Sequence, residues 1–85
     1  MAIKKNDANT LSLDVNLYYF NKKIVIKNKE KTELILTVYN LTGQMIIKQP
    51  LKPDYNEVIL DSKGIYLIKI IDTTGRSIIR KFFIK

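Results

Sequence analysis

The sequence contains no cysteine, no histidine and no tryptophan, and its only serines are Ser12, Ser62 and Ser77. The lack of cysteine excludes disulfide bonds and thiolate metal sites. The lack of histidine removes the usual general base and the commonest metal ligand, and no serine lies in the context of a nucleophile elbow. We therefore expect neither an enzyme nor a bound cofactor.

Long apolar runs are absent too. The longest run, in residues 65–71, is interrupted by Lys69 and is far shorter than the roughly 18 residues of a membrane helix. Residues 1–10 contain two lysines but no apolar stretch, so they do not form an intact signal peptide. An upstream signal peptide or a larger upstream region remains compatible with this sequence. We expect residues 1–9 to be disordered or added by cloning, and residues 10–85 to form a single domain.

Negative charge is scarce. The 15 lysine and arginine residues outnumber the 8 acidic residues, which gives a formal net charge of +7 at neutral pH. Such a balance suggests nucleic acid or another anionic partner. Only two of the basic residues are arginine, however, and arginine is the side chain that best matches phosphate. The lysines are also spread along the whole chain, so the pattern argues against nucleic-acid binding.

Apolar and polar residues alternate with a period of two in residues 11–17, 23–27, 33–40, 57–60 and 64–71. This alternation is typical of half-buried strands. Together with the short polar turns between these segments, it predicts an all-β fold without helices, a small antiparallel immunoglobulin-like β-sandwich of about seven strands. The predicted core residues are Leu13, Val15, Ile24, Ile26, Leu36, Val38, Ile47, Val58, Leu60, Tyr66, Ile68, Ile70, Phe82 and Ile84.

Glycine and proline mark the turns. We expect a positive φ at Gly43 and at Gly75, because each ends a polar segment of the hairpin-turn type. Pro50 and Pro53 cannot lie in a central strand, since proline donates no backbone hydrogen bond.

The last predicted strand contains a conflict. Arg80 shares a face with Ile78, Phe82 and Ile84, and we expect a bulge to separate it from them. The strand ends in the sequence KFFIK, in which lysines flank the apolar residues, as is common in edge strands.

Residues 61–66 resemble the tyrosine corner of immunoglobulin-like sandwiches. Asp61 opens a polar turn, Gly64 permits a sharp bend, and Tyr66 begins an apolar strand. In such a corner the ring packs in the core while the hydroxyl binds backbone a few residues upstream. We expect the same of Tyr66.

The acidic residues do not suggest catalysis or metal binding. Asp61 and Asp72 flank one strand and would lie roughly 35 Å apart if it is extended, too far for a glycosidase pair. We interpret both as turn caps. Asp54, Glu57 and Asp61 could together contact a calcium ion, but the dense Asx loop of an EF-hand is missing.

Tyr18, Tyr19 and Phe20 form an aromatic cluster near the first turn. Two interpretations remain open. Alternate members pack inward, as in any strand, or the cluster stacks against a sugar or a partner surface.

Three motifs together resemble the C-terminal sorting domain of type IX secretion cargo in Bacteroidetes. Tyr39, Asn40, Gly43 and Gln44 match the Tyr-Asx-x-x-Gly-Arg/Lys/Gln turn of that family. The sequence DSKGIY matches its Asp/Ser-x-x-Gly-x-Tyr element, and KFFIK matches its final Lys-rich apolar strand. The resemblance covers roughly residues 15–85. Many members begin with Pro-Asn-Pro, which this chain replaces by VNLYYFNKKIVI.

The resemblance implies a non-catalytic domain that directs an attached passenger through the periplasm and across the outer membrane. It implies type IX translocon and sortase components as partners, with the passenger ending at the cell surface or in the medium. Within this hypothesis Arg80, Lys81 and Lys85 are the candidate recognition residues, because they lie near the end of the last strand.

Two other functions remain open. The chain could be a standalone envelope adhesion or carbohydrate-binding protein, or a nucleic-acid binder. A free edge strand would also permit β-augmentation, either in a homodimer or in docking to a receptor.

Overall fold

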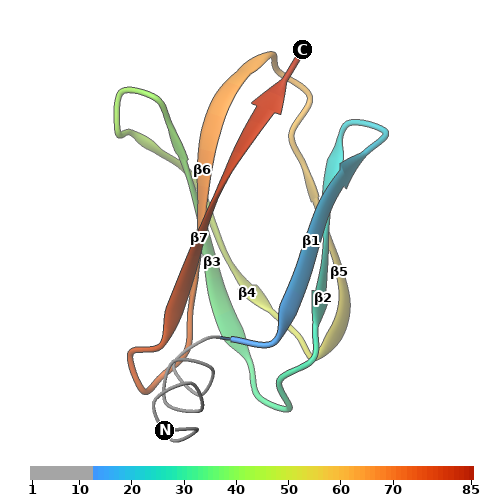
Figure 1. Ribbon diagram of the computed structural model, residues 1–85, viewed down its shortest axis with the longest axis vertical. Coiled ribbons are helices and arrows are strands. Elements are labelled where there is room, and N and C mark those ends of the chain that lie inside the picture. Colours follow the sequence, from blue (N-terminus) through green and yellow to red (C-terminus); the bar gives the residue numbers. More distant parts are fainter. Residues whose placement is uncertain (1–12) are drawn as a thin grey trace, which may run out of the picture.

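A computed structural model describes residues 13–85 (Figure 1). Within this range seven strands form two antiparallel sheets and no helix is present, so the predicted all-β sandwich is confirmed. The smaller sheet has the order β1 (Val15–Phe20), β2 (Lys23–Asn28), β5 (Asp54–Ile59), and the larger has the order β4 (Met45–Leu51), β3 (Leu34–Asn40), β6 (Gly64–Ile71), β7 (Ser77–Ile84). The expectation for residues 1–9 lies outside the described range.

The connections gather at the two ends of the sandwich (Figure 1). The hairpins β1–β2, β3–β4 and β6–β7 stay within one sheet, and the other three connections cross between the sheets. The β1–β2 turn, the β3–β4 turn and the β5–β6 connection lie at the end where β7 finishes, which we call the distal end. The β2–β3, β4–β5 and β6–β7 connections lie at the opposite, proximal end.

The core is a single layer of side chains between the sheets. It forms because each strand alternates, so that one side of every strand faces the other sheet. Of the predicted core, Ile47 and Phe82 are only partly buried, while Leu34, Leu51 and Ile78 are core residues that the prediction omitted. The buried cluster comprises Leu13, Val15, Ile24, Ile26, Leu34, Leu36, Val38, Leu51, Val58, Leu60, Tyr66, Ile68, Ile70, Ile78 and Ile84.

The predicted bulge in the last strand is wrong. β7 pairs with β6 without interruption from Gly64↔Ile84 to Ile71↔Ser77. Arg80, opposite Ile68, is exposed although its position in the alternation is a core-facing one. It needs no bulge because β7 is the last strand of its sheet, where a long side chain can extend past the edge into water. The irregular pairing lies between β3 and β4 instead, at Val38/Tyr39.

The aromatic cluster of β1 follows the strand alternation. Tyr19 packs against the core, whereas Tyr18 and Phe20 are 51% and 66% exposed, so alternate members do pack inward. Pro50 lies in β4, an edge strand, as expected for proline.

We expect Leu36→Ala to lower the free energy of unfolding by about 2–5 kcal/mol, because it empties part of a fully buried site in a one-layer core. Ile59→Ala is the matched control, since Ile59 is 71% exposed, and it should shift stability by about 0.5 kcal/mol or less. Urea denaturation followed by circular dichroism measures both. Equal losses in the two variants would contradict this description of the core.

Candidate functional site

The three sequence motifs meet on adjacent strands at the distal end. Asn40 of YNLTGQ pairs with Tyr66 of DSKGIY, and Tyr66 pairs with Phe82 of KFFIK. The motifs are separated in the sequence but form one row across β3, β6 and β7, which we call the motif row. A surface cavity of about 410 Å³ lies between the first two motifs and is lined by Asn40, Leu41, Thr42, Lys63, Gly64, Ile65 and Tyr66.

Tyr66 forms a tyrosine corner. Its ring is 7% exposed, and its hydroxyl donates to the carbonyl oxygen of Ser62 at 3.1 Å. Gly64 has a φ of +147°, a conformation that side chains with a Cβ rarely adopt. A Cβ there would lie 3.5 Å from the Tyr66 ring, which is an ordinary contact, so the backbone angle rather than space requires glycine.

A second tyrosine supports the same connection from the other sheet. The Tyr19 hydroxyl donates to the carbonyl oxygen of Leu60 at 2.9 Å. Tyr19 and Tyr66 thus bind consecutive parts of the β5–β6 connection, one from each sheet. This role of Tyr19 leaves no local pattern in the sequence, because the hydrogen bond joins residues 41 positions apart.

The β3–β4 and β6–β7 hairpins end in the same five-residue turn. Asn40 Oδ1 accepts hydrogen bonds from the backbone of Thr42 and Gln44, and Asp72 Oδ1 accepts them from Thr74 and Arg76. The two glycines of these turns, Gly43 and Gly75, have φ values of +90° and +95°. The sequence pattern Asx-x-Thr-Gly, at residues 40–43 and 72–75, is common to both turns.

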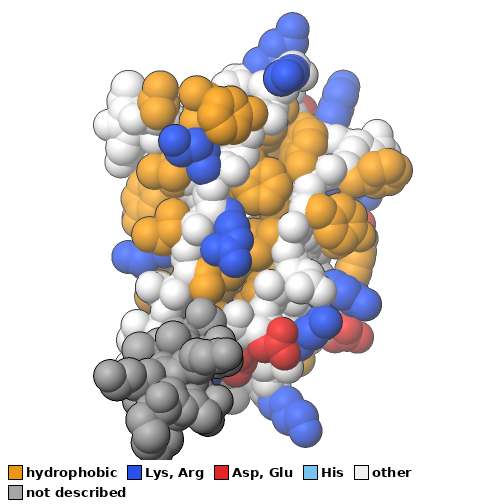
Figure 2. Space-filling model, in the orientation of Figure 1, with side chains coloured by type: hydrophobic (Ala, Val, Ile, Leu, Met, Phe, Trp, Pro, Cys, Tyr) orange, Lys and Arg blue, Asp and Glu red, His pale blue; other side chains and the backbone are white. Residues whose placement is uncertain are grey.

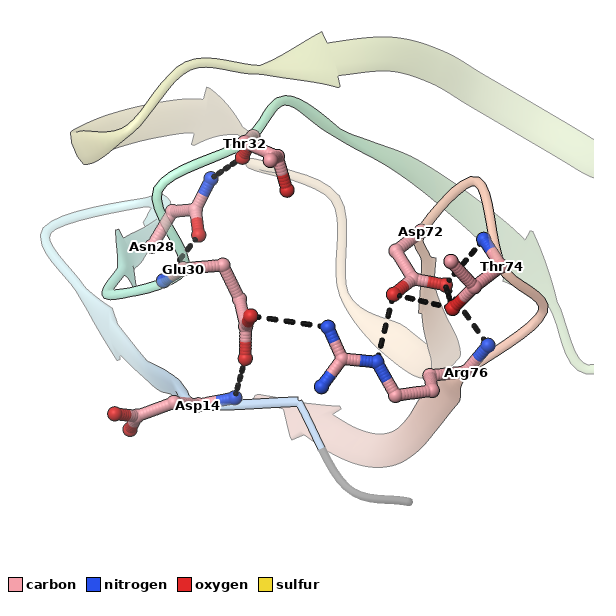
Figure 3. Close-up of polar contacts among 7 residues, drawn as sticks. All are labelled: Asp14, Asn28, Glu30, Thr32, Asp72, Thr74 and Arg76. Atoms are coloured by element: carbon pink, nitrogen blue, oxygen red, sulfur yellow. Dashed lines mark hydrogen bonds and ion pairs between the residues drawn. The ribbon is translucent and has the colours of Figure 1, made fainter. Parts of the chain in front are cut away.

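At the proximal end, an ion pair joins the β6–β7 turn to the β2–β3 connection (Figure 3). Arg76 Nε lies 2.7 Å from Asp72 Oδ2, and Arg76 Nη2 lies 3.0 Å from Glu30 Oε1. Glu30 also accepts the backbone N–H of Asp14 at 2.7 Å, and its own N–H donates to the buried Asn28 side chain. One carboxylate thus links the β2–β3 connection, the segment before β1 and the β6–β7 turn.

Burial would raise the pKa of Asp72, but hydrogen bonds from Arg76 and Thr74 outweigh it and lower the pKa from 3.8 to about 2. The Asp72 side chain is only 4% exposed. Asp72 therefore acts as the turn cap that the sequence predicted. Asp61, in the β5–β6 connection, is exposed and its carboxylate forms no hydrogen bond within residues 13–85, so the cap interpretation does not extend to it.

The candidate recognition residues do not converge on one face. Arg80 and Lys81 point to opposite sides of β7 by the strand alternation. Arg80 Nη1 donates to the Ile79 carbonyl oxygen at 3.1 Å, and Lys81 Nζ lies 6.0 Å from the centre of the Phe83 ring. Lys85 follows the strand and is exposed. The feature that Arg80 and Lys81 share is the outer edge of β7.

Asp54, Glu57 and Asp61 are not brought together as a metal site: no group of three potential ligands is close enough in residues 13–85. Glu57 instead accepts hydrogen bonds from Lys23 and Tyr55. In the same range of residues, no helix has the length and apolar character needed to cross a membrane.

The family model for the secretion system C-terminal sorting domain matches residues 20–85. The chain therefore belongs to the family of type IX secretion C-terminal sorting domains. No curated protein matches the sequence. A domain of this family is a sorting signal for a secreted protein exported across the outer membrane, and it interacts with the type IX secretion machinery.

We expect Tyr66→Phe to lower stability by about 1 kcal/mol, because the ring stays while the Ser62 carbonyl loses its partner. Tyr66→Ala should lower it by about 3–5 kcal/mol, since it also leaves a cavity in the core. Thermal and urea unfolding of both variants measures this. A Tyr66→Phe variant as unstable as Tyr66→Ala would contradict the division between ring and hydroxyl.

We expect Asp72 to contribute a pH-dependent part of the stability. The pKa of Asp72 is lower in the folded state than its ordinary value of 3.8. Its contribution to the free energy of unfolding is therefore present at pH values above 3.8 and is lost as the pH falls toward about 2. NMR titration of the carboxyl carbon should give a value near 2. Asp72→Asn should remove this part of the acid unfolding profile, whereas Asp61→Asn, which removes an exposed carboxylate outside the network, should retain it. An unchanged profile for Asp72→Asn would refute the assignment.

Proposed function

We propose that this domain carries an attached passenger through the periplasm and across the outer membrane to the cell surface, where a sortase removes it or anchors the passenger. The observation that supports this most strongly is the motif row, which gathers the three family motifs at the distal end beside a free strand edge. The isolated motifs are common in small sandwiches, but their alignment on adjacent strands brings all three to one end of the domain, next to the outer edge of β7.

The recognition element in this proposal is the outer edge of β7. Among residues 13–85, β7 is the terminal strand of the larger sheet and pairs with β6 alone. Its outer backbone groups are therefore available to a strand of the translocon, which would extend the sheet by β-augmentation. Arg80 and Lys81 flank this edge on its two sides, so acidic groups on the receptor could select both.

An apolar seam beside β7 supports the same proposal. Figure 2 shows apolar side chains between the two sheets on the side of the molecule where β7 and β1 lie. On these strands Phe82 and Leu17 are only partly buried against the core. A strand added to β7 would cover apolar surface as well as pair with backbone, and burying such surface favours association.

The alternative function is an envelope adhesion or carbohydrate-binding protein. The exposed rings of Tyr18 and Phe20 favour it, because aromatic faces can stack against sugars. Family membership favours the sorting function. The export experiment below separates the two, since an adhesion domain gives a fused passenger no route across the outer membrane.

The test is a periplasm-targeted reporter fused before the domain and produced in a type IX-competent host. We expect Lys81→Glu with Lys85→Glu to leave the reporter in the periplasm, while the purified variant melts within about a few degrees of wild type, because exposed substitutions usually change stability by about 0.5 kcal/mol or less. The matched control is Lys27→Glu with Lys31→Glu, which makes the same change of charge at exposed positions away from β7.

Protease accessibility of the reporter on intact cells gives the readout. Export of the Lys81/Lys85 variant at the wild-type level would exclude these lysines from recognition. Equal export defects in the test and control variants would show that net charge, rather than the end of β7, matters. A wild-type fusion that stays in the periplasm would count against the sorting function itself.

A further inference from the structure

The outer face of the four-stranded sheet, turned away from the core, combines apolar and basic side chains without any acidic ones. The register places Thr37, Lys48, Lys69 and Ile79 in one row across the four strands. None of the outward positions of β3, β4, β6 and β7 is Asp or Glu. Beyond that row the outward residues are Ile35, Tyr39, Pro50, Ile65, Leu67, Ile71, Ser77, Lys81 and Phe83, with Met45 and Ile46 at the irregular pairing. We call this surface the basic-apolar face.

Several of its apolar side chains are open to water. Ile79 is 57% exposed, Phe83 62% and Met45 53%. Met45 lies on one edge strand of the sheet and Ile79 and Phe83 on the other, and the half-buried Tyr39 and Leu67 lie between the two edges. Single exposed apolar residues are normal, whereas apolar side chains that continue across a sheet suggest an interaction surface. Since each strand contributes only one side to the core, these outward side chains have no role in the packing between the sheets.

The outer face of the smaller sheet differs in its charges. There Lys23 and Glu57 form an ion pair at 3.2 Å, and Tyr55 donates to the same carboxylate. This face thus carries a carboxylate that pairs with Lys23, although Lys27 on the same face is exposed and forms no ion pair within residues 13–85. Within residues 13–85, Lys48, Lys69 and Lys81 form no ion pair, so these ammonium groups can pair with carboxylates of another molecule.

We propose that the basic-apolar face docks a protein whose contact surface combines apolar side chains with Asp and Glu carboxylates. The proposal rests on the sorting function in one respect, that it takes this protein to be part of the export machinery. In this proposal the export machinery contacts the domain at two places, the edge of β7 and the basic-apolar face, which is centred on β3 and β6. Contact with the face would position the domain before the edge of β7 pairs with a strand of the machinery, or while it does so. Apolar contacts supply affinity, and the lysines supply the choice of partner.

The lysines also make two other binding partners of this face unfavourable, a second copy of the domain and a membrane. A second copy docked through the same face would bring together two faces that each carry Lys48, Lys69 and Lys81 and no carboxylate to neutralise them. A membrane would accept lysines at a rim, but Lys69 lies on β6, an inner strand, and is only partly exposed. Placing an ammonium group there against hydrocarbon is unfavourable, whereas a carboxylate on a protein can pair with it.

Site-specific photo-cross-linking in the reporter fusion tests the proposal. The photo-reactive amino acid p-benzoylphenylalanine replaces Ile79 on the basic-apolar face, or Tyr18 on the other outer face as the control. Their exposures, 57% and 51%, are similar. We expect irradiation of the cells to link position 79, but not position 18, to an envelope protein, and the cross-linked peptide to lie beside Asp or Glu residues.

Charge reversal is the second arm. Lys48→Glu with Lys69→Glu should reduce the cross-link from position 79 by about tenfold or more, because two attractive contacts become repulsive. Lys27→Glu with Lys31→Glu should leave it unchanged. If the reversed variant does not fold, Lys48→Gln with Lys69→Gln replaces it and should also weaken the cross-link. Replacing the Asp and Glu residues beside the cross-linked peptide of the partner with lysine should restore the cross-link from position 79 in the Lys48→Glu, Lys69→Glu variant.

The proposal would be overturned if position 79 formed adducts only with lipid, with the fused reporter or with a second copy of the domain. It would also be overturned if positions 79 and 18 gave equal adducts, if no adduct formed, or if charge reversal had no effect on the cross-link. Failure of the sorting function is seen separately, as a wild-type reporter that stays in the periplasm. In that case the adducts formed in the periplasm still show whether the face binds an acidic protein surface.

Discussion

The structure depends on one constraint, that a single layer of branched apolar side chains must hold two sheets together. Ile24 and Ile26 from one sheet meet Leu36, Ile68 and Ile70 from the other, and all five are fully buried. A two-layer domain has no second core, so the other side of every strand is surface. Polar chemistry is therefore confined to the two ends, the strand edges and the two outer faces. In this domain the edges and outer faces carry the features suited to recognition.

The two ends of the sandwich are closed by different chemistry. At the proximal end, Arg76 and Glu30 join the sheets through charged hydrogen bonds. At the distal end, Tyr19 and Tyr66 donate hydrogen bonds from their hydroxyls to the backbone of the β5–β6 connection. The motif row thus sits beside a connection that a hydrogen bond from each sheet holds in place. A recognition surface benefits from such rigidity, because little conformational freedom is lost when it binds.

Much of this architecture could be predicted from local patterns. The alternation of apolar and polar residues with a period of two predicted most of the strands and the side of each that faces the core. The segment around Gly64 and Tyr66 predicted the tyrosine corner, because the hydrogen bond of that corner joins residues only four positions apart. Features that depend on how distant residues pair could not be predicted from the sequence. The exposure of Arg80 on the core-facing side of β7 was one of them, because strand alternation alone does not show that a long side chain can extend past the edge of the sheet. The link from Glu30 to Arg76 joins residues 46 positions apart, and the acid-free outer face appears only once the register of four strands is known.

The measurement that tests the account most directly is delivery of one reporter to the cell surface under three conditions. The reporter carries the wild-type domain in a type IX-competent strain, the same domain in a strain lacking the translocon, or no domain in the competent strain. The account predicts protease-accessible reporter on intact cells only in the first condition, with the reporter confined to the periplasm in the other two. Surface reporter without the translocon, or none in the first condition while the domain is folded, would contradict the conclusion that this sandwich is a sorting signal for type IX secretion.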